Sequence, residues 1–409
     1  MNHDNQEEQA LLLRPSYATS KFLLCHELGN FRVSLKWCAL DHSSCLGKSI
    51  SYSIFIFFTL IVPIITSVFV QLPSSASLDD PISFKLLVQF PESGLALIAF
   101  CTLSRFFRRY GLRQLLFLDG LQDDSLFVTR RYSRELDKAF RYLACILLPS
   151  FFLQLAHKII YFSTVKVKLP GISSSGVPMN SIMFVLVLGS WAYRTGVLLL
   201  VCVLFRLTCE LQILRFEGLH KLLEGCESDV GIIFREHIRI RKQLSATSHR
   251  YRIFIISCLV TITISQLGAL LLVLAFKSDK NFFNSGDLVI CSVVQISGFF
   301  LCLLGAARIT HRAQGIVSIA TRWHMMVTSA SHQGKCVVPE THDADSSDIF
   351  ISQDPSSFQT RQAFVAYLQH NHGGITLFGF PLDRGLLHTL FAFEFSLVLW
   401  ILSKVIVLS

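Results

Sequence analysis

The chain has 409 residues, of which 52% are hydrophobic and 16% are charged, and its mean hydropathy is +0.51. Such a chain carries more apolar surface than one water-soluble core can bury, which excludes a fully soluble protein. The net charge of +9 would suit a nucleic-acid partner if the basic residues formed one patch. They lie instead in the gaps between apolar runs, so we expect a protein of the lipid bilayer and no nucleic-acid partner.

Seven apolar runs are long enough to cross the roughly 30 Å of hydrocarbon in a bilayer, which takes about 20 helical residues. They cover residues 50–72, 86–107, 140–162, 182–205, 253–276, 288–307 and 386–408. The second run is the weakest, because Pro91 and Glu92 lie in its first turns. Without it, every later crossing would have the opposite orientation.

The distribution of Lys and Arg predicts the orientation of these crossings. Both residue types are dense in the gaps 105–141 and 206–252 and sparse in the gaps 73–85, 164–180 and 277–287. Because basic loops stay in the cytosol, this pattern supports seven crossings, with the N-terminus in the cytosol and the C-terminus outside. Receptors that couple to G proteins have the opposite orientation.

The segments between the runs divide the chain further. We expect a cytosolic N-terminal segment at 1–49, without a signal peptide, and six membrane helices with cytosolic helical extensions at 50–328. Leucines at steps of three and four predict long helices on both sides of a break near 225–231; an isolated amphipathic hairpin on the membrane surface is the alternative. Residues 329–357 should form a disordered cytosolic loop. A split last helix should follow at 358–409, with a cytosolic part at 358–370 and a membrane part at 386–408.

A short motif near the start of the chain resembles a membrane-protein sorting signal. Glu7 precedes Leu11 and Leu12 at the spacing of the dileucine signals that adaptor proteins bind. It lies in a tail that we place in the cytosol. We therefore expect residence in the plasma membrane or in an endosomal or vacuolar membrane.

The start of the last run carries a resemblance to known families. Its entry motif consists of Leu382, Asp383, Arg384, Leu386 and Leu387. The region from 373 to 404 resembles the C-terminal part of the plant gustatory-receptor-like membrane proteins and, through them, the insect odorant and gustatory receptors. Those families share seven helices, a cytosolic N-terminus and a split last helix.

The resemblance implies a fold and an assembly. The insect receptors are tetrameric ligand-gated cation channels, whose last helices line the pore and whose cytosolic helix extensions anchor the subunits. The resemblance therefore implies an all-α membrane protein with an insect odorant-receptor-like fold. It also implies a homotetrameric assembly and a small-molecule ligand. Of the insect signature beyond the entry motif, only the small hydroxyl at Ser396 is kept.

Polar residues inside the apolar runs are the candidate functional residues, because each costs several kcal/mol in lipid unless water or a partner satisfies it. Pore candidates are Glu394, Ser396 and Ser403. A ring of Glu394 carboxylates would attract cations. Alternatively, Glu394 pairs with Arg194 or forms a hydrogen bond between helices, and has only a packing role.

Arg194 lies near the middle of the fourth run and needs a partner or a hydrated cavity. Glu92 supplies a second carboxylate, and Gln154 and Gln266 supply amides. These residues form either a ligand pocket or an intramembrane ion pair. Pro63 and Pro149 should kink their helices and leave a carbonyl free in each.

The chain has no recognisable enzyme motif and no Cys or His spacing typical of a metal site, so we expect no enzymatic activity and no cofactor. The leading hypothesis is a receptor-like membrane protein that forms a homo-oligomeric ligand-gated cation channel, or a derivative of one. The alternative is a non-conducting scaffold or sensor whose basic cytosolic helices bind partners or anionic lipids.

Overall fold

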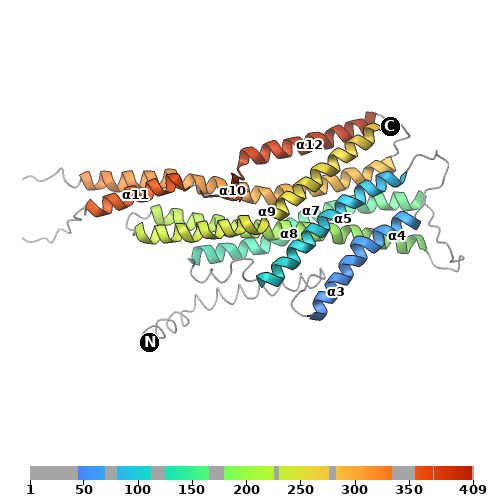
Figure 1. Ribbon diagram of the computed structural model, residues 1–409, viewed down its shortest axis with the longest axis horizontal. Helices are drawn as coiled ribbons and strands as arrows, with labels where there is room; N and C mark the ends of the chain where they lie inside the picture. The colour runs from blue at the N-terminus through green and yellow to red at the C-terminus, as the bar shows by residue number, and fades with distance from the viewer. Residues whose placement is uncertain are drawn as a thin grey trace, which may run out of the picture.

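The described part of the protein consists almost entirely of helices, some of which run along its longest axis and others obliquely to it (Figure 1). The structure, a computed structural model, describes residues 45–69, 81–111, 124, 126–164, 179–224, 230–275, 282–333, 355–371 and 373–407. The elements are α3 (Cys45–Ile56), the π-helix η1 (Phe57–Ile61), α4 (Val62–Phe69), α5 (Pro81–Arg109), α7 (Leu126–Thr164), α8 (Met179–Glu224), α9 (Val230–Ala275), α10 (Phe282–Gln333), α11 (Pro355–His370), β1 (Thr376–Leu377), β2 (Phe380–Pro381) and α12 (Arg384–Val407). The sorting motif Glu7, Leu11 and Leu12 lies outside the described residues.

Within the described ranges, six helical segments are long and apolar enough to cross a membrane. They are Leu46–Ser67, Phe127–Ser163, Asn180–Leu223, Val230–Leu271, Gly286–Ser329 and Arg384–Ser403. The seventh expected crossing, 86–107, forms most of α5, a helix of 29 residues that packs against α8 and α9 but is less apolar. The prediction of an all-α protein with apolar spans is therefore confirmed.

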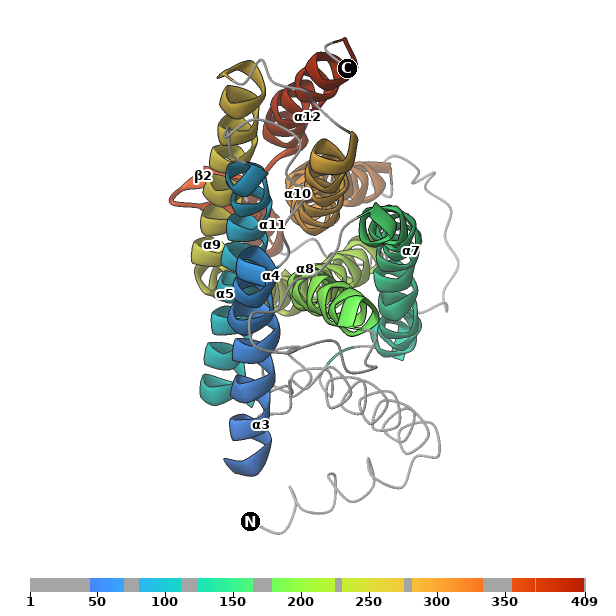
Figure 2. The same ribbon diagram turned by 90° about the vertical axis from the view of Figure 1, so that its right-hand side faces the viewer.

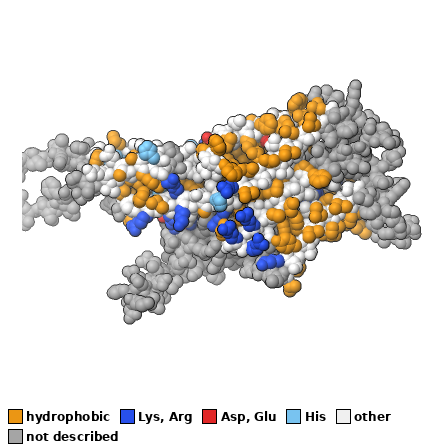
Figure 3. All heavy atoms as spheres, in the orientation of Figure 1, with side chains coloured by type: hydrophobic (Ala, Val, Ile, Leu, Met, Phe, Trp, Pro, Cys, Tyr) orange, Lys and Arg blue, Asp and Glu red, His pale blue; other side chains and the backbone are white. Residues whose placement is uncertain are grey.

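The outer surface of the bundle is apolar. Large hydrophobic side chains point away from the protein on most of the long helices, among them Phe152, Val185, Ile264, Leu271 and Leu399. In Figure 3 such side chains cover much of the right-hand half of the coloured surface, and Lys and Arg gather between this half and the helix ends on the left. A contiguous apolar surface of this extent is stable only in contact with lipid or another protein chain.

Helix α8 forms the centre of the bundle. It packs against α5, α7 and α10, and its most apolar stretch is completely buried (Figure 2). Small side chains allow this close packing. A Cβ at Gly305 of α10 would lie 3.2 Å from the Cβ of Cys209 in α8.

Three helices continue well beyond the length that a bilayer needs. Helices α8 and α9 have 46 residues each and α10 has 52, against the roughly 20 residues of one crossing. Helix α8 ends at Glu224 and α9 begins at Val230, close to the break predicted near 225–231. The extensions of α9 and α10 also contact α11, so they form a packed unit and not an isolated surface hairpin.

A buried ion-pair cluster holds this extension together. Arg215 of α8 has a side chain only 1% exposed, and its Nη2 lies 2.7 Å from Oδ2 of Asp124. Arg239 of α9 pairs with the same carboxylate, and Gln243 accepts a hydrogen bond from Arg215. Because each charge has a partner, these buried groups are compatible with a stable fold.

Two predicted boundaries and one connection differ from the structure. Helix α10 extends to Gln333, into the segment expected to be disordered from 329, and α11 begins at Pro355 instead of 358. The rest of that segment lies outside the described residues. Between α11 and α12 the chain forms an unexpected β-hairpin, which pairs Leu377 with Phe380.

The hairpin turn consists of Phe378 and Gly379, with φ angles of 49° and 93°. Two positive φ angles are typical of a type I′ turn, whose twist matches that of two antiparallel strands. The hairpin is anchored to the bundle because the backbone N–H of Ile375 donates to Oγ1 of Thr310, at 3.3 Å.

Candidate functional site

A buried ion pair connects α5 and α8 inside the apolar bundle. Nη2 of Arg194 lies 2.9 Å from Oε2 of Glu92, and the two side chains are only 7% and 6% exposed. The thiol of Cys291 in α10 donates to Oε1 of Glu92 at 2.6 Å. The second guanidinium nitrogen, Nη1, donates to Oγ of Ser93 at 3.2 Å. Of the two carboxylates that sequence analysis considered for Arg194, the partner is Glu92.

The network extends into the first membrane helix through a break in its hydrogen bonding. Pro63 has no N–H, so the carbonyl of Thr59, four residues earlier, loses its usual donor. The π-turn η1 also directs the N–H of Val62 to Phe57, which leaves the carbonyl of Phe58 without an intrahelical donor.

Two serines satisfy these freed carbonyls. Oγ of Ser93 in α5 donates to the carbonyl of Thr59 at 3.1 Å, and Oγ of Ser190 in α8 donates to the carbonyl of Phe58 at 2.5 Å. Ser93 thus connects the carbonyl freed by Pro63 to Arg194. The resulting network joins four helical segments of the chain, and its polar groups satisfy one another at a depth where water is scarce.

A second polar cluster joins α7 to the start of α10. Asp287 accepts a hydrogen bond from Nε2 of Gln154 at 2.8 Å and pairs with Lys158. Nδ1 of His157 lies 3.2 Å from the same carboxylate. The structure therefore separates Gln154 from the Arg194 network, although both were candidates for one pocket.

Glu394 lies at the contact between α12 and α9. Its side chain is buried, and Oε1 accepts a hydrogen bond from Oγ1 of Thr263. Oε2 has no hydrogen-bond partner among the described residues. Gln266, one turn further along α9, is 0% exposed, and neither atom of its amide has a partner in the described part of the chain.

Ser396 and Ser403 lie on the opposite side of α12, where both are exposed. Two residues along a helix correspond to a rotation of about 200°, so Glu394 and Ser396 cannot face the same space within one protomer. The two serines are seven residues apart and share a face. That exposed face carries small or hydroxyl side chains, namely Gly385, Thr389, Ala392, Ser396 and Ser403, and also the large side chain of Trp400, four residues after Ser396. Thr389 was not among the predicted pore residues. Its position seven residues before Ser396, which is itself seven residues before Ser403, indicates that it shares their face of the helix.

The entry motif of the last helix starts α12. The Asp383 side chain accepts a hydrogen bond from the N–H of Leu386 at 2.7 Å, which is the geometry of an N-cap. Leu382 and Leu387 are buried, whereas Arg384 and Leu386 are exposed. In this structure the motif fixes the position at which α12 begins.

The fold and these polar contacts define a helical integral membrane protein. Residues 26–393 match the family described as "Protein of unknown function (DUF3537)", and the chain belongs to that family. No curated protein matches the sequence.

Two solved structures are similar in fold. The insect olfactory receptor OR5 from Machilis hrabei in complex with eugenol has a TM-score of 0.54 and 11% sequence identity, over 88% of this chain and 91% of that chain. A second structure of the same receptor has a TM-score of 0.51 and 11% identity, over 88% and 89% of the two chains. At this identity the similarity shows the fold alone, and it confirms the expected odorant-receptor-like fold.

Proposed function

We propose that this protein is a receptor-like multi-pass membrane protein that assembles as a homotetramer and conducts cations under the control of a small-molecule ligand. The similarity in fold to an insect olfactory receptor, over 88% of the chain, is the observation that carries the proposal. Among the families that the sequence resembles, we assign it to the plant gustatory-receptor-like proteins. The membrane in question is the plasma membrane or an endosomal or vacuolar membrane.

The proposed topology has seven crossings, a cytosolic N-terminus and an outside C-terminus. It counts α5 as a crossing, because this helix has the length of a span and its Glu92 is paired with Arg194. The exposed Arg105, Arg108 and Arg109 at the end of α5 would then lie on the cytosolic side, as the positive-inside rule requires. Tags at Met1 and Ser409 that are accessible from the same side would contradict this topology.

The proposed pore is lined by the exposed face of α12 that carries Thr389, Ser396 and Ser403. Hydroxyl groups and small side chains leave room for hydrated cations, whereas a lipid-facing surface favours bulky apolar residues. Glu394 lies outside this face, and we give it a role in the contact between α12 and α9.

Current recordings from the reconstituted protein test the channel. Ser396→Trp should place a bulky side chain in the path and reduce the current roughly tenfold or more. Ile264→Trp, on the exposed face of α9, is the matched control and should leave the current unchanged. A wild-type protein that carries no cation current in varied lipids, or a Ser396→Trp variant that conducts normally, would contradict the proposal.

The second candidate function is a non-conducting scaffold or sensor that binds partners or anionic lipids. The band of Lys and Arg beside the helix extensions favours it (Figure 3). The oligomeric state in the membrane separates the two functions, because a pore lined by α12 needs several copies of the chain. A monomer would favour the scaffold.

A further inference from the structure

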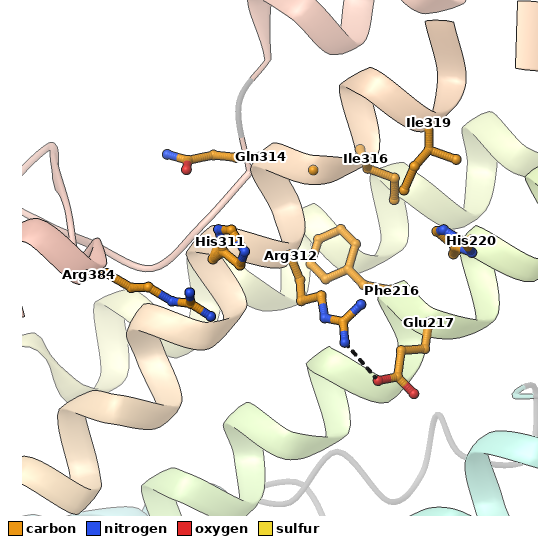
Figure 4. Close-up of a pocket in the computed structure, with 10 residues that line it drawn as sticks. Phe216, Glu217, His220, His311, Arg312, Gln314, Ile316, Ile319 and Arg384 are labelled. Carbon is orange, nitrogen blue, oxygen red and sulfur yellow. Dashed lines mark ion pairs between the residues drawn. The ribbon is translucent and has the colours of Figure 1, made fainter. Parts of the chain in front are cut away.

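A cavity of about 630 Å³ opens where α8, α10 and the start of α12 meet. Its polar lining comes from three helices, with Glu217 and His220 on α8, His311 and Arg312 on α10, and Arg384 on α12. Figure 4 shows the side chain of Arg312 extending from α10 toward Glu217. The size is that of a pocket for a small ligand or a lipid headgroup.

The cavity has an excess of positive charge. Of its lining residues Glu217 alone is acidic, and this carboxylate is shared by Arg131 at 2.8 Å and Arg312 at 3.7 Å. Two guanidinium groups therefore compete for one carboxylate. Arg384 forms no ion pair within the described residues, and the side chain of Arg312 is 56% exposed.

The remaining lining is apolar. Phe216 and Ile316 are buried at the base of the cavity, and Ile319 lies one turn further along α10. A ligand that fits this site has a charged end for the arginines and an apolar part for these side chains.

The position of the cavity along the helices identifies the layer of the membrane in which it lies. His311 and Arg312 follow the end of the apolar run 288–307 within two turns, and Arg384, the first residue of α12, lies two residues before the apolar run 386–408. The cavity thus begins at the level of lipid headgroups, and it extends away from the bilayer along α8, where Glu217 and His220 lie 12 and 15 residues past the apolar run 182–205. The orientation proposed above places this level in the cytosolic leaflet. The binding chemistry of the cavity does not depend on that orientation.

We propose that this cavity binds a phosphate-bearing anion, namely the phosphorylated headgroup of an anionic lipid. Planar guanidinium groups bind phosphate oxygens in pairs, and two imidazoles supply further donors. Basic pockets between membrane helices are known sites for polyphosphorylated headgroups. A soluble inositol phosphate carries the same chemistry, so the experiment has to separate the two sources.

The test measures binding to the full-length protein in detergent with two probes, short-chain phosphatidylinositol bisphosphate and inositol trisphosphate. The double variant Arg312→Gln with Arg384→Gln should bind the lipid roughly tenfold more weakly or worse. Arg322→Gln removes an exposed charge from α10 outside the cavity and is the matched control, with an expected change of less than about twofold. An equal loss in the control, or none in the double variant, overturns the proposal.

A second variant blocks the cavity and leaves its charges in place. Gly315 lines the cavity, and a Cβ added there would meet no heavy atom within 4 Å. Because Gly weakens a helix interior, Gly315→Leu should fold at least as well as the wild type and should still abolish binding. Normal binding by this folded variant overturns the proposal even where the arginine variant fails to fold.

Competition identifies the source of the phosphate. Inositol trisphosphate that fails to displace the lipid supports a membrane headgroup, and equal displacement supports a soluble inositol phosphate in the same cavity. If neither probe binds, the proposal is wrong. Since the protein is in detergent, this outcome does not depend on the topology or on channel activity.

Discussion

Two polar sites inside the same apolar bundle differ in how completely their groups are satisfied. At the contact of α5 and α8, Arg194 and Glu92 pair with each other and have further partners in Ser93 and Cys291. At the contact of α9 and α12, Glu394 has one hydrogen bond, and the Gln266 amide has none among the described residues. The first site has the properties of a structural connection, and the second retains unused hydrogen-bonding capacity.

This difference has an energetic reason. A charge buried away from water is tolerated when a partner of opposite charge is fixed beside it, and removing that partner is costly. A single interhelical hydrogen bond in a membrane contributes much less. Substitutions at the two sites should therefore have effects of different size, and the following four predictions test this order.

The largest effect is expected for Arg194→Ala. It leaves the Glu92 carboxylate buried without its cation, which should lower the free energy of unfolding by about 3–5 kcal/mol. Denaturant unfolding of the purified protein in micelles measures this. The double variant Arg194→Met with Glu92→Leu removes both charges and should recover most of the loss; a double variant as unstable as Arg194→Ala would show that the pair is not the cause.

Ser93→Ala should have the next largest effect. It removes the donor to the freed carbonyl of Thr59 and one partner of Arg194, at a cost of about 1–3 kcal/mol. The control is Ser67→Ala in α4, whose hydroxyl donates to the carbonyl of Ile64 in its own helix. Equal unfolding midpoints for the two variants would contradict a connecting role for Ser93.

Gln266→Leu should be neutral or stabilising by up to about 1 kcal/mol, because it replaces an unpaired buried amide by an apolar side chain of similar size. Thermal unfolding of the purified protein detects this. A loss of more than about 2 kcal/mol would mean that the amide has a partner in the assembled protein, such as a ligand, an ion or a second copy of the chain.

The smallest effect on stability is expected for Glu394→Gln. The new amide oxygen can still accept the hydrogen bond from Thr263, so the change should be below about 1 kcal/mol. Ion selectivity should also stay the same, because Glu394 points away from the face that we propose for the pore. A change in selectivity recorded with this variant would show that Glu394 does contribute to the ion path.

Much of the fold could be predicted from the sequence. The positions of the apolar runs follow from residue hydropathy and helix length alone, and the break between α8 and α9 follows from local periodicity. The β-hairpin between α11 and α12 was missed, because its two short strands lie between helices and its turn uses Phe378 where Asn or Gly would be the usual signal.

The candidate site was predicted less completely. Hydropathy identifies Arg194, Glu92 and Glu394 as groups that need partners, but it cannot say which side chains meet. The pairing depends on how α5 and α8 are rotated about their axes. The carbonyl oxygens freed near Pro63 likewise accept hydrogen bonds from Ser93 and Ser190, which lie on other helices. Such contacts join residues up to 199 positions apart in the chain.

The sequence by itself determined that this chain enters a membrane, where its helices lie and which groups are costly to bury. These properties depend on each residue's transfer from water to lipid and on its neighbours along the helix. Only the tertiary structure decided that Arg194 pairs with Glu92, that Glu394 faces α9, and that Arg312 and Arg384 line one cavity. Those contacts depend on the relative rotation of packed helices, which a one-dimensional pattern does not specify.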